Sequence, residues 1–416
     1  MGSSEDAKRP AKSRRARGEG SIWPDRERPN RKTGWWYAVS IDGKQRKYRA
    51  PDQQTAAARL KQLKEELEHG VTPNAGNATL GKHCQAWMEK IVVNLKPKTQ
   101  RFYRQTTEHY LLPYLGENRP IKKITAGNIV DMMNSMRRAG YAAQTIDHAY
   151  TVGKAIFEQA RKWRKIIFNP FDDVKPPVVK TVEPTPLSTA GVAALRYAVE
   201  RHRLYALYEL SWTLGIRKAE LLGLTLAGLD LQAGAITVSQ QVLDLDEGPS
   251  IEPYTKNDWV RTLPLTPRLV TLLRIRQEQL LAERGDGWVE HGLLFSSERG
   301  TPISERNLDR HFKAACVQAQ IRRRDTGKQN KKGAPIYKSD LKFHHLRHTC
   351  LSWLGDTSAS DMVIKAIAGH ADKDVTDRYV HVSLSAMREA IERLELAKIL
   401  QQNDDQTAPK RVAEGG

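Results

Sequence analysis

The stretch Phe343-His-His-Leu-Arg-His-Thr349 decides how the rest of the chain is interpreted. His344 and Arg347 are three positions apart, so a helix places both side chains on one face. A guanidinium can donate to two phosphate oxygens, and an imidazole can donate to a third or transfer a proton. The spacing therefore indicates a phosphate site. A metal site is disfavoured, because the stretch has no acidic residue and no zincin pattern.

A second stretch, Leu214-Gly-Ile-Arg-Lys-Ala-Glu-Leu-Leu222, indicates a helix that ends at Gly215 and another that begins near Arg217. The N–H groups of the second helix and the Arg217 side chain would then point at one place, which is an anion site. The alternative is a surface ion pair between Arg217 and Glu220, which is worth only a few tenths of a kcal/mol.

Three further blocks contain a lysine, a histidine and a tyrosine. Thr255-Lys-Asn257 lies between two predicted strands, Ile367-Ala-Gly-His370 follows a predicted helix, and Tyr379 lies in Asp377-Arg-Tyr-Val-His381. In this order and spacing, the five blocks resemble the tyrosine recombinase (phage integrase) family. The resemblance extends over the C-terminal half of the chain, and the preceding segments resemble the core-binding and arm-binding domains of the three-domain integrases.

The resemblance implies that Tyr379 attacks the scissile phosphodiester and forms a 3'-phosphotyrosyl intermediate that stores the bond energy for rejoining. No ATP, metal or other cofactor is then needed. The charge on the phosphate must be neutralised by protein groups, and the resemblance assigns this role to Arg217 and Arg347.

The remaining site residues are also assigned by the resemblance. Lys256 would protonate the departing 5'-oxygen, and His344 would assist proton transfer. His370 would hydrogen-bond the phosphate, and Glu220 would support the site without acting directly.

Three positions depart from the usual pattern of the family. Leu214 stands where the family often has Thr, Gly228 where it often has Asp, and Ala368 where Leu normally precedes Gly-His. These departures concern local packing more than activity. Cys350, next to the His-Arg stretch, is expected in the core.

The fold class that follows is a multidomain, mainly α chain with small β-sheets: a small N-terminal sheet with a helix, an all-helical core-binding domain and an α+β catalytic domain. The predicted boundaries are a flexible basic tail over 1–17, an arm-type DNA-binding domain over 18–72, a SAM-like core-binding domain over 78–172, a linker over 173–186, the catalytic domain over 187–400 and a flexible tail over 401–416.

Local patterns support the two N-terminal domains. Strands over 34–41 and 44–49 are predicted on either side of Asp42-Gly43, which is a strong hairpin signal, and a helix is predicted over 55–69. Aromatic residues on this small sheet fit either its core or a DNA groove. In the helical domain, Thr125 is expected to cap a helix with one buried face, formed by Ile129, Met132, Met133 and Met136.

In the catalytic domain, a strand is predicted over 235–242, and a strand pair is predicted to flank Lys256 as a hairpin. A tail helix is predicted over 384–400, with Met387, Ala390, Ile391 and Leu394 on one face. That face could pack on its own domain or on a neighbouring subunit, and the pattern alone favours neither.

Charge supports a nucleic-acid partner. The 416 residues include 67 Lys and Arg against 48 Asp and Glu, a net charge of +19, which favours a polyanion. The basic residues concentrate in Lys8–Arg17, Arg31–Arg49 and Arg322–Lys342. The candidate DNA-binding residues are Arg31, Lys32, Lys44, Arg46, Lys47, Arg49, Lys96, Lys98, Arg101 and Arg104.

Several classes are excluded. No stretch approaches the roughly 18 apolar residues of a membrane span, and the N-terminus lacks the apolar segment of a signal peptide. A cytoplasmic, nucleoid-associated protein is therefore expected. The three cysteines are far apart, so neither a disulfide framework nor a thiolate zinc site is indicated.

The predicted function is a site-specific recombinase that integrates or excises a phage or other mobile element. Its partners would be double-stranded DNA at core and arm attachment sites and three further copies in a homotetramer, with a host DNA-bending factor or an excisionase as a candidate accessory protein. The alternatives are a type IB topoisomerase and a sequence-specific DNA-binding protein with an inactive site.

Overall fold

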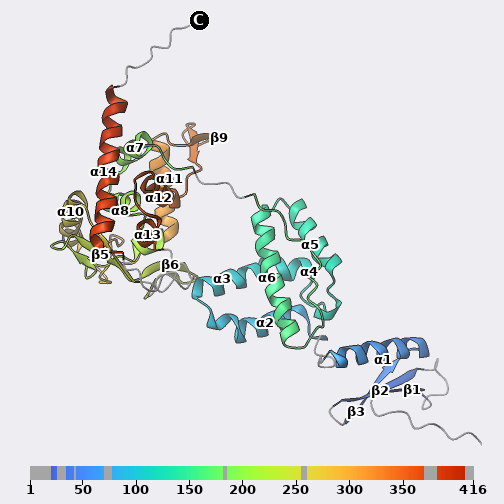
Figure 1. The fold of residues 1–416 in the computed structure, drawn as a ribbon. Coiled ribbons are helices and arrows are strands. Elements are labelled where there is room, and N and C mark those ends of the chain that lie inside the picture. The colour runs from blue at the N-terminus through green and yellow to red at the C-terminus, as the bar shows by residue number, and fades with distance from the viewer. Residues whose placement is uncertain are drawn as a thin grey trace, which may run out of the picture. The chain divides into compact units, whose positions relative to one another are not determined.

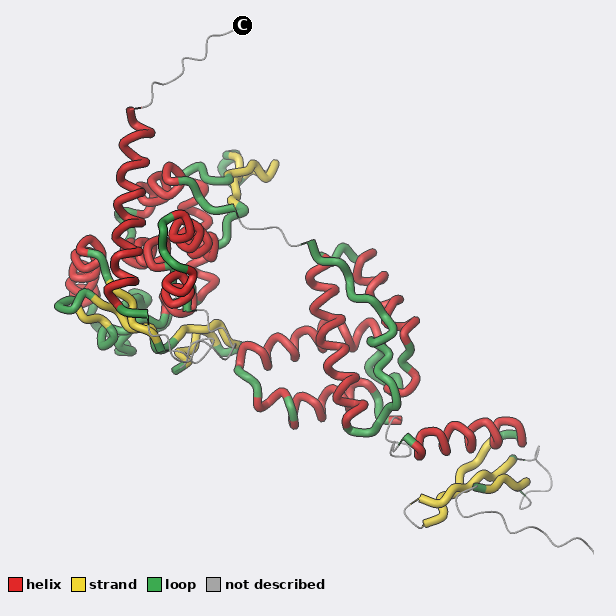
Figure 2. The backbone as a smooth tube through the Cα atoms, in the orientation of Figure 1, coloured by secondary structure: helices red, strands yellow, loops and turns green. Residues whose placement is uncertain are grey.

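The computed structural model describes residues 20–25, 34–41, 44–69, 77–180, 185–253, 260–369 and 382–407. The chain forms two compact units, one up to Lys180 and one from Thr181. Small sheets accompany a larger number of helices, which confirms the predicted mainly α fold (Figure 2). No helix of the described residues is long and apolar enough to cross a membrane.

The N-terminal sheet has three antiparallel strands and one helix. These elements are β1 (Ser21–Pro24), β2 (Trp35–Ile41), β3 (Lys44–Ala50) and α1 (Gln53–Glu68). The predicted strands and helix are confirmed, whereas β1, which pairs with β2, was not predicted. The predicted turn Asp42-Gly43 lies outside the described residues. The carboxylate of Asp52 begins α1 by accepting a hydrogen bond from the Thr55 N–H at 2.7 Å.

The two faces of this sheet differ in composition. Tyr37 stacks on Tyr48 with 5.3 Å between ring centroids, and both pack with Leu63 of α1 in the small core. On the opposite face, Trp36 and Arg49 stand directly across from each other. The aromatic residues therefore divide between the core and an outer face that also carries basic side chains.

The rest of the first unit is helical, as predicted. Its elements are α2 (Leu80–Lys90), η2 (Val92–Asn94), α3 (Pro97–Thr106), η3 (Thr107–Leu111), α4 (Leu112–Leu115), η4 (Ile121–Lys123), α5 (Ala126–Arg138) and α6 (Ala143–Lys162). Thr125 caps α5 in a capping box with Asn128, which confirms that prediction. The predicted face of α5 is buried in the core of the domain.

The second unit contains eight described helices and seven described strands. The helices are α7 (Thr189–Val199), α8 (Tyr205–Leu214), α9 (Lys218–Leu222), α10 (Pro267–Glu283), α11 (Glu305–Gln318), α12 (His344–Asp356), α13 (Asp361–Ala368) and α14 (Leu384–Thr407). The strands are β4 (Leu229–Asp230), β5 (Ala235–Val238), β6 (Gln241–Leu245), β7 (Gly248–Glu252), β8 (Arg261–Pro264), β9 (Arg323–Gln329) and β10 (Pro335–Ser339). Helix α8 is buried from Ala206 to Leu214 and packs on α12 within this unit (Figure 1).

The prediction of one continuous strand over 235–242 is wrong, because this stretch contains β5 and the start of β6, which belong to different sheets. β5 lies between β4 and β8, whereas β6 pairs with β7. Between them the backbone passes Gly223 so closely that a Cβ there would lie 2.8 Å from the Gln240 carbonyl oxygen. The two strands that flank Lys256 are likewise not a hairpin, since β7 pairs with β6 and β8 with β5.

The tail helix α14 packs on its own unit. Met387, Ala390, Ile391 and Leu394 are all buried in the core of that unit. Arg388 adds a hydrogen bond from Nη1 to the Leu265 carbonyl oxygen at 2.8 Å. Of the two arrangements that the pattern allows, the first turns of the helix adopt the one within the subunit.

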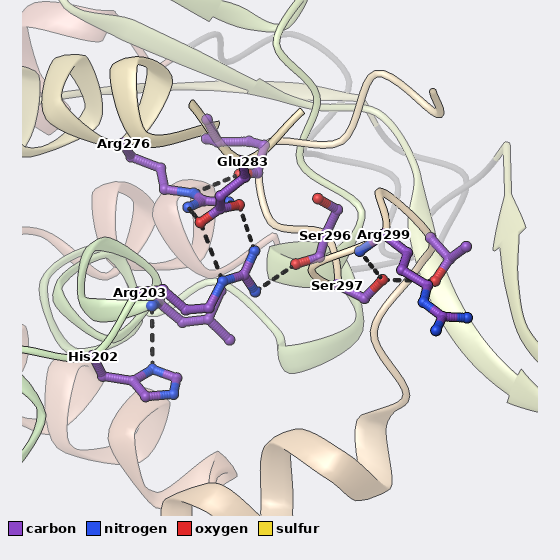
Figure 3. Close-up of polar contacts among 10 residues, drawn as sticks. His202, Arg203, Arg276, Glu283, Ser296, Ser297 and Arg299 are labelled. Carbon is purple, nitrogen blue, oxygen red and sulfur yellow. Dashed lines mark hydrogen bonds and ion pairs between the residues drawn. The ribbon is translucent and has the colours of Figure 1, made fainter. Parts of the chain in front are cut away.

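A network of one buried and two half-buried charges holds the segment that follows α10 (Figure 3). Arg276 and Arg203 both pair with Glu283, at 2.8 and 2.6 Å. Arg203 also donates to the carbonyl oxygen of Ser296, and Arg276 to that of Leu294. These contacts fix the segment around Leu294. Its backbone also bonds to the segment that follows α9, because the Leu294 N–H donates to the carbonyl oxygen of Leu224 at 2.8 Å.

Candidate active site

The site starts where α8 ends. Gly215 has φ +59°, a left-handed conformation that glycine adopts without strain, and it ends the helix as predicted. A Cβ at this position would lie 3.3 Å from the Sγ of Cys350, so the turn packs closely on α12. This turn directs the carbonyl oxygen of Gly215 and the side chain of Arg217 toward the same region.

Arg347 is fixed between two helix ends. Its guanidinium is nearly inaccessible, and it donates from Nη1 to the Gly215 carbonyl oxygen and from Nη2 to that of Ala368, both at 2.7 Å. Burial, followed by the charge of Arg217, lowers the pKa of Arg347 to about 10. The group therefore stays cationic at neutral pH, in a position that helix carbonyl groups define.

Arg217 stands at the start of α9 and pairs with a fully buried carboxylate. Its Nη1 lies 2.9 Å from Oε1 of Glu220, and its Nη2 donates to the Gly369 carbonyl oxygen at 2.8 Å. The ion pair between Arg217 and Glu220 considered above is therefore present, but its predicted place on the surface is wrong, because Glu220 has no exposed surface. The pair is part of the interior and orients Arg217.

A third guanidinium, that of Arg261, was missed by the sequence analysis. Arg261 is the first residue of β8, is buried, and places Nη2 2.7 Å from Oε2 of Glu220. Its Nε is buried without a hydrogen-bond partner among the described residues. The same guanidinium packs on Gly369, where a Cβ would lie 2.8 Å from its Cζ. The only signal in the sequence was a charged residue at the start of an apolar strand.

Two arginines thus hold one carboxylate. Burial raises the pKa of Glu220, but the hydrogen bond and charge of Arg261, together with those of Arg217, outweigh burial and lower it. Glu220 is therefore ionised at neutral pH. It links the start of α9 to the start of β8.

His344 is the first residue of α12. Its side chain is partly open to solvent, yet the surrounding protein atoms and then the neighbouring His348, Arg347 and Arg217 lower the pKa of its imidazole to about 4. The rings of His344 and His348 lie edge to face, with 4.8 Å between centroids. At neutral pH the imidazole is uncharged and can donate one hydrogen bond and accept another.

The structure brings Arg217, Arg347, His344 and Glu220 together, since each interacts electrostatically with at least one other of the four. They come from the start of α9 and the start of α12. The predicted residues Lys256, His370 and Tyr379 lie outside the described residues. Two site residues flank these gaps: Gly369 directly precedes residue 370, and Arg261 begins the strand that follows residue 256.

The three departures from the family pattern have local explanations. Leu214 is fully buried in the core. Ala368 contributes its carbonyl oxygen to Arg347, which does not depend on the side chain. At Gly228 a Cβ would lie 2.9 Å from the Thr237 carbonyl oxygen, so the backbone here suits glycine. Cys350 is buried, as predicted.

The predicted DNA-binding residues lie on two elements, and two of them lie outside the described residues. On β3, Lys47 and Arg49 share the outer face with Trp36, whereas Arg46 lies on the opposite face. Lys44 begins the same strand, and Arg31 and Lys32 lie outside the described residues. In the helical domain, Lys96 precedes α3, which carries Lys98, Arg101 and Arg104 at steps of three.

Comparisons with known proteins agree with this arrangement. The sequence pattern of the phage integrase family matches residues 191–385, and that of the phage integrase N-terminal SAM-like domain matches residues 79–137. A tyrosine recombinase XerC-like protein of Caldanaerobacter subterraneus is 26% identical over 363 residues, covering 82% of this chain and 88% of that protein. An integrase of Saccharopolyspora erythraea is 21% identical over 426 residues, covering 87% and 94%.

Solved structures show the same fold. The Tn1549 transposon integrase in complex with transposon right end DNA matches with a TM-score of 0.58 at 22% identity, covering 76% of this chain and all of that one. A lambda integrase tetramer bound to a Holliday junction matches with a TM-score of 0.55 at 19% identity, covering 83% and 96%. Family patterns, relatives and fold therefore agree, and the chain belongs to the phage integrase family of tyrosine recombinases.

Proposed function

We propose that the chain is a site-specific DNA recombinase that cleaves and rejoins double-stranded DNA through a 3'-phosphotyrosine intermediate, and that it integrates or excises a mobile element. The observation that carries the proposal is the pair of guanidiniums, Arg217 and Arg347, fixed by backbone carbonyl groups beside a neutral imidazole. A phosphodiester is the substrate that this set of donors fits.

The proposed reaction uses these groups without rearranging them. The Tyr379 oxygen attacks the phosphorus, the bond from phosphorus to the 5'-oxygen breaks, and the tyrosine oxygen becomes joined to the 3'-phosphate. Arg217 and Arg347 neutralise the charge that grows on the nonbridging oxygens. Because hydrogen bonds to Gly369, Gly215 and Ala368 already hold both groups, little reorganisation is needed.

Proton transfer completes each step. Lys256 gives a proton to the departing 5'-oxygen, which leaves as a hydroxyl group, and the reverse step returns that proton. The uncharged His344 can take up the tyrosine proton or hydrogen-bond a phosphate oxygen, because the surrounding protein atoms and the neighbouring His348, Arg347 and Arg217 keep its pKa near 4. His370, which follows Gly369 in the sequence, would hydrogen-bond the phosphate.

The DNA contacts are assigned to the first unit. The arm-type domain would use Arg31, Lys32, Lys44, Arg46, Lys47 and Arg49, and the core-binding domain would use Lys96, Lys98, Arg101 and Arg104. Lys47 and Arg49 lie with Trp36 on the face of the sheet away from α1, which suits a sheet laid against DNA. Four copies would act on two duplexes, as in the lambda integrase tetramer on a Holliday junction.

The experiment uses a duplex from the attachment region of the element, nicked near the cleavage point so that the cleaved strand stays on the protein. Wild type and Tyr379→Phe are run on a denaturing gel, with EDTA throughout. We expect a covalent band for wild type and none for the variant. If both proteins shift the duplex and neither forms the adduct on any attachment sequence tried, the chain is a DNA-binding protein with an inactive site.

A further inference from the structure

The third basic concentration of the sequence has no role in the site. It runs from Arg322 to Lys342 and includes eight basic and two acidic residues. The structure folds most of it into a hairpin of β9 and β10, at the edge of the second unit (Figure 2).

This hairpin is held together by backbone and turn contacts and has no core of its own. No side chain of β9 is buried, and in β10 only Ser339 is. Asn330 organises the turn: its side-chain oxygen accepts hydrogen bonds from the N–H groups of Lys332 and Ala334, at 2.9 and 3.0 Å. The base is tied down where Ser339 donates to the Ile321 carbonyl oxygen at 3.0 Å. A two-stranded ribbon of this kind gains little from apolar burial.

The charges on the ribbon repel one another. Arg324 stands directly opposite Lys338, and like charges at such positions destabilise an antiparallel pair. Asp340 lies 2.9 Å from Arg324 but is largely exposed, so this ion pair offsets little of the repulsion. Lys328, Lys331 and Lys332 are exposed at or near the turn.

The ribbon carries one aromatic ring, that of Tyr337. The guanidinium of Arg323 on β9 lies 3.5 Å from the centre of the Tyr337 ring on β10, a distance at which a cation and an aromatic face attract each other. The ribbon therefore combines a fixed backbone with cations that the protein itself does not neutralise well. Such an element is stabilised by a polyanion.

We propose that the β9–β10 hairpin is a separate contact of the catalytic unit with the phosphate backbone of duplex DNA, independent of base sequence. The proposal rests on the proposed function, and it adds a contact distinct from the arm-type and core-binding domains. Duplex DNA is the partner favoured, because a two-stranded ribbon matches the width of a major groove and its Lys and Arg side chains then reach the phosphates on both sides.

The test measures how salt affects binding to a fluorescein-labelled duplex of random sequence, by anisotropy with the full chain. The hairpin variant combines three substitutions in one protein: Lys328→Gln, Lys332→Gln and Lys338→Gln. The matched control, Arg201→Gln, Arg274→Gln, Arg299→Gln, removes the same charge from exposed positions elsewhere on the same unit. Each lost phosphate contact should reduce the magnitude of the slope of log K against log salt by about 0.9. With three lysines replaced, the slope for the hairpin variant should be smaller in magnitude than that of wild type by roughly 2 to 3. The control should retain the wild-type slope.

Equal slopes for the hairpin variant and the control would overturn the hairpin contact and leave the proposed function intact. If wild type itself bound duplex DNA without salt dependence, the proposed function would fail first. A photocrosslinking residue at position 332, compared with one at 299, provides a second measurement that does not depend on charge removal. Crosslinking to DNA only from 332 supports the proposal, and crosslinking from neither position, or equally from both, contradicts it.

Discussion

Arg261 shows how a single buried side chain can organise the site. It shares the Glu220 carboxylate with Arg217, and its guanidinium lies against Gly369, whose carbonyl oxygen also holds Arg217. Both contacts lead to the guanidinium proposed to bind the phosphate. We therefore regard Arg261 as a positioning residue.

Replacing Arg261 with Met should lower the free energy of unfolding by about 3 kcal/mol, because Glu220 would keep only one of its two buried partners. Cleavage of the nicked duplex in a single turnover at saturating protein should also slow by about 100-fold, since small displacements of aligned groups are costly. Urea denaturation and adduct formation measure the two effects.

Arg261→Lys separates the two contributions. It retains the charge beside Glu220 and should recover most of the stability, but it lacks the planar fork, so cleavage should stay slow. If the Met and Lys variants both cleaved as fast as wild type, Arg261 would have only a structural role.

His344 should titrate well below an ordinary histidine. With a pKa of about 4 in the folded chain against roughly 6.5 in the unfolded chain, it stays neutral until the pH falls far below 6. The unfolded chain takes up its proton first, so the stabilisation is complete above about pH 6.5 and is lost as the pH falls toward 4. His344→Gln should therefore show a smaller loss of stability over that range.

The measurement is an NMR titration of histidine labelled with carbon-13 at Cε1, in which His344→Gln identifies the resonance. Adding a duplex should raise the midpoint, because a nearby phosphate charge favours the imidazolium form. A midpoint near 6.5 in the free protein would contradict the environment described for this ring.

Whether a contact within the site could be predicted from the sequence depended on how far apart its two residues are along the chain. His344 and Arg347 are three residues apart on one helix, so spacing alone places them together. Arg261 meets Glu220 across 41 positions, and nothing in the local pattern indicates that contact. The roles of the carbonyl oxygens of Gly215, Ala368 and Gly369 could not be predicted for a different reason. Every residue has a backbone carbonyl group, so the sequence does not distinguish the three that accept hydrogen bonds from the arginines.

At the scale of elements, the ends of helices carry the site. The C-termini of α8 and α13 present carbonyl groups to the arginines, while α9 and α12 begin with residues that we propose bind the phosphate. Helix positions were predictable from apolar periodicity and from caps such as Thr125 and Gly215. Strand pairing was not: the alternation over 235–242 continues through a change of sheet, because alternation reports burial and not the pairing partner.

Gly369→Ala tests the end of α13. The residue has φ +65° and its Cβ would lie 2.8 Å from the Cζ of Arg261, so the substitution should destabilise the fold by about 2 kcal/mol and slow cleavage. Gly355→Ala in α12 is the matched control, because its Cβ would meet nothing within 4 Å and its φ is helical. The control should be neutral or stabilising by about 0.5 kcal/mol.

Thermal and urea unfolding, with the adduct assay alongside, measure both glycine variants. If Gly369→Ala were as stable and active as Gly355→Ala, the close contact between residue 369 and Arg261 would not matter to the site.

At the scale of the whole molecule, the described residues form three separate hydrophobic cores, one in the N-terminal sheet and its helix, one in the helical domain and one in the second unit. Separate cores allow one domain to be removed without unfolding the others. The net positive charge indicated a nucleic-acid partner for the whole chain. It could not show which domain contacts that partner, because a count of Lys and Arg does not say where these residues lie in the fold.

Deleting residues 1–76 removes the first of these cores and leaves the other two intact. Because the site residues Arg217, His344 and Arg347 all lie in the second unit, the shortened chain should still form the covalent adduct on a core site. Binding to a duplex that carries an arm site should weaken, and its salt slope should fall by about 0.9 for each phosphate contact that the sheet made. Anisotropy over a range of salt concentrations, with the adduct assay on the same preparation, separates the two effects. An unchanged slope on arm-site DNA would show that the basic face of β3 makes no phosphate contacts, whereas loss of the adduct would show that the catalytic unit depends on the N-terminal sheet.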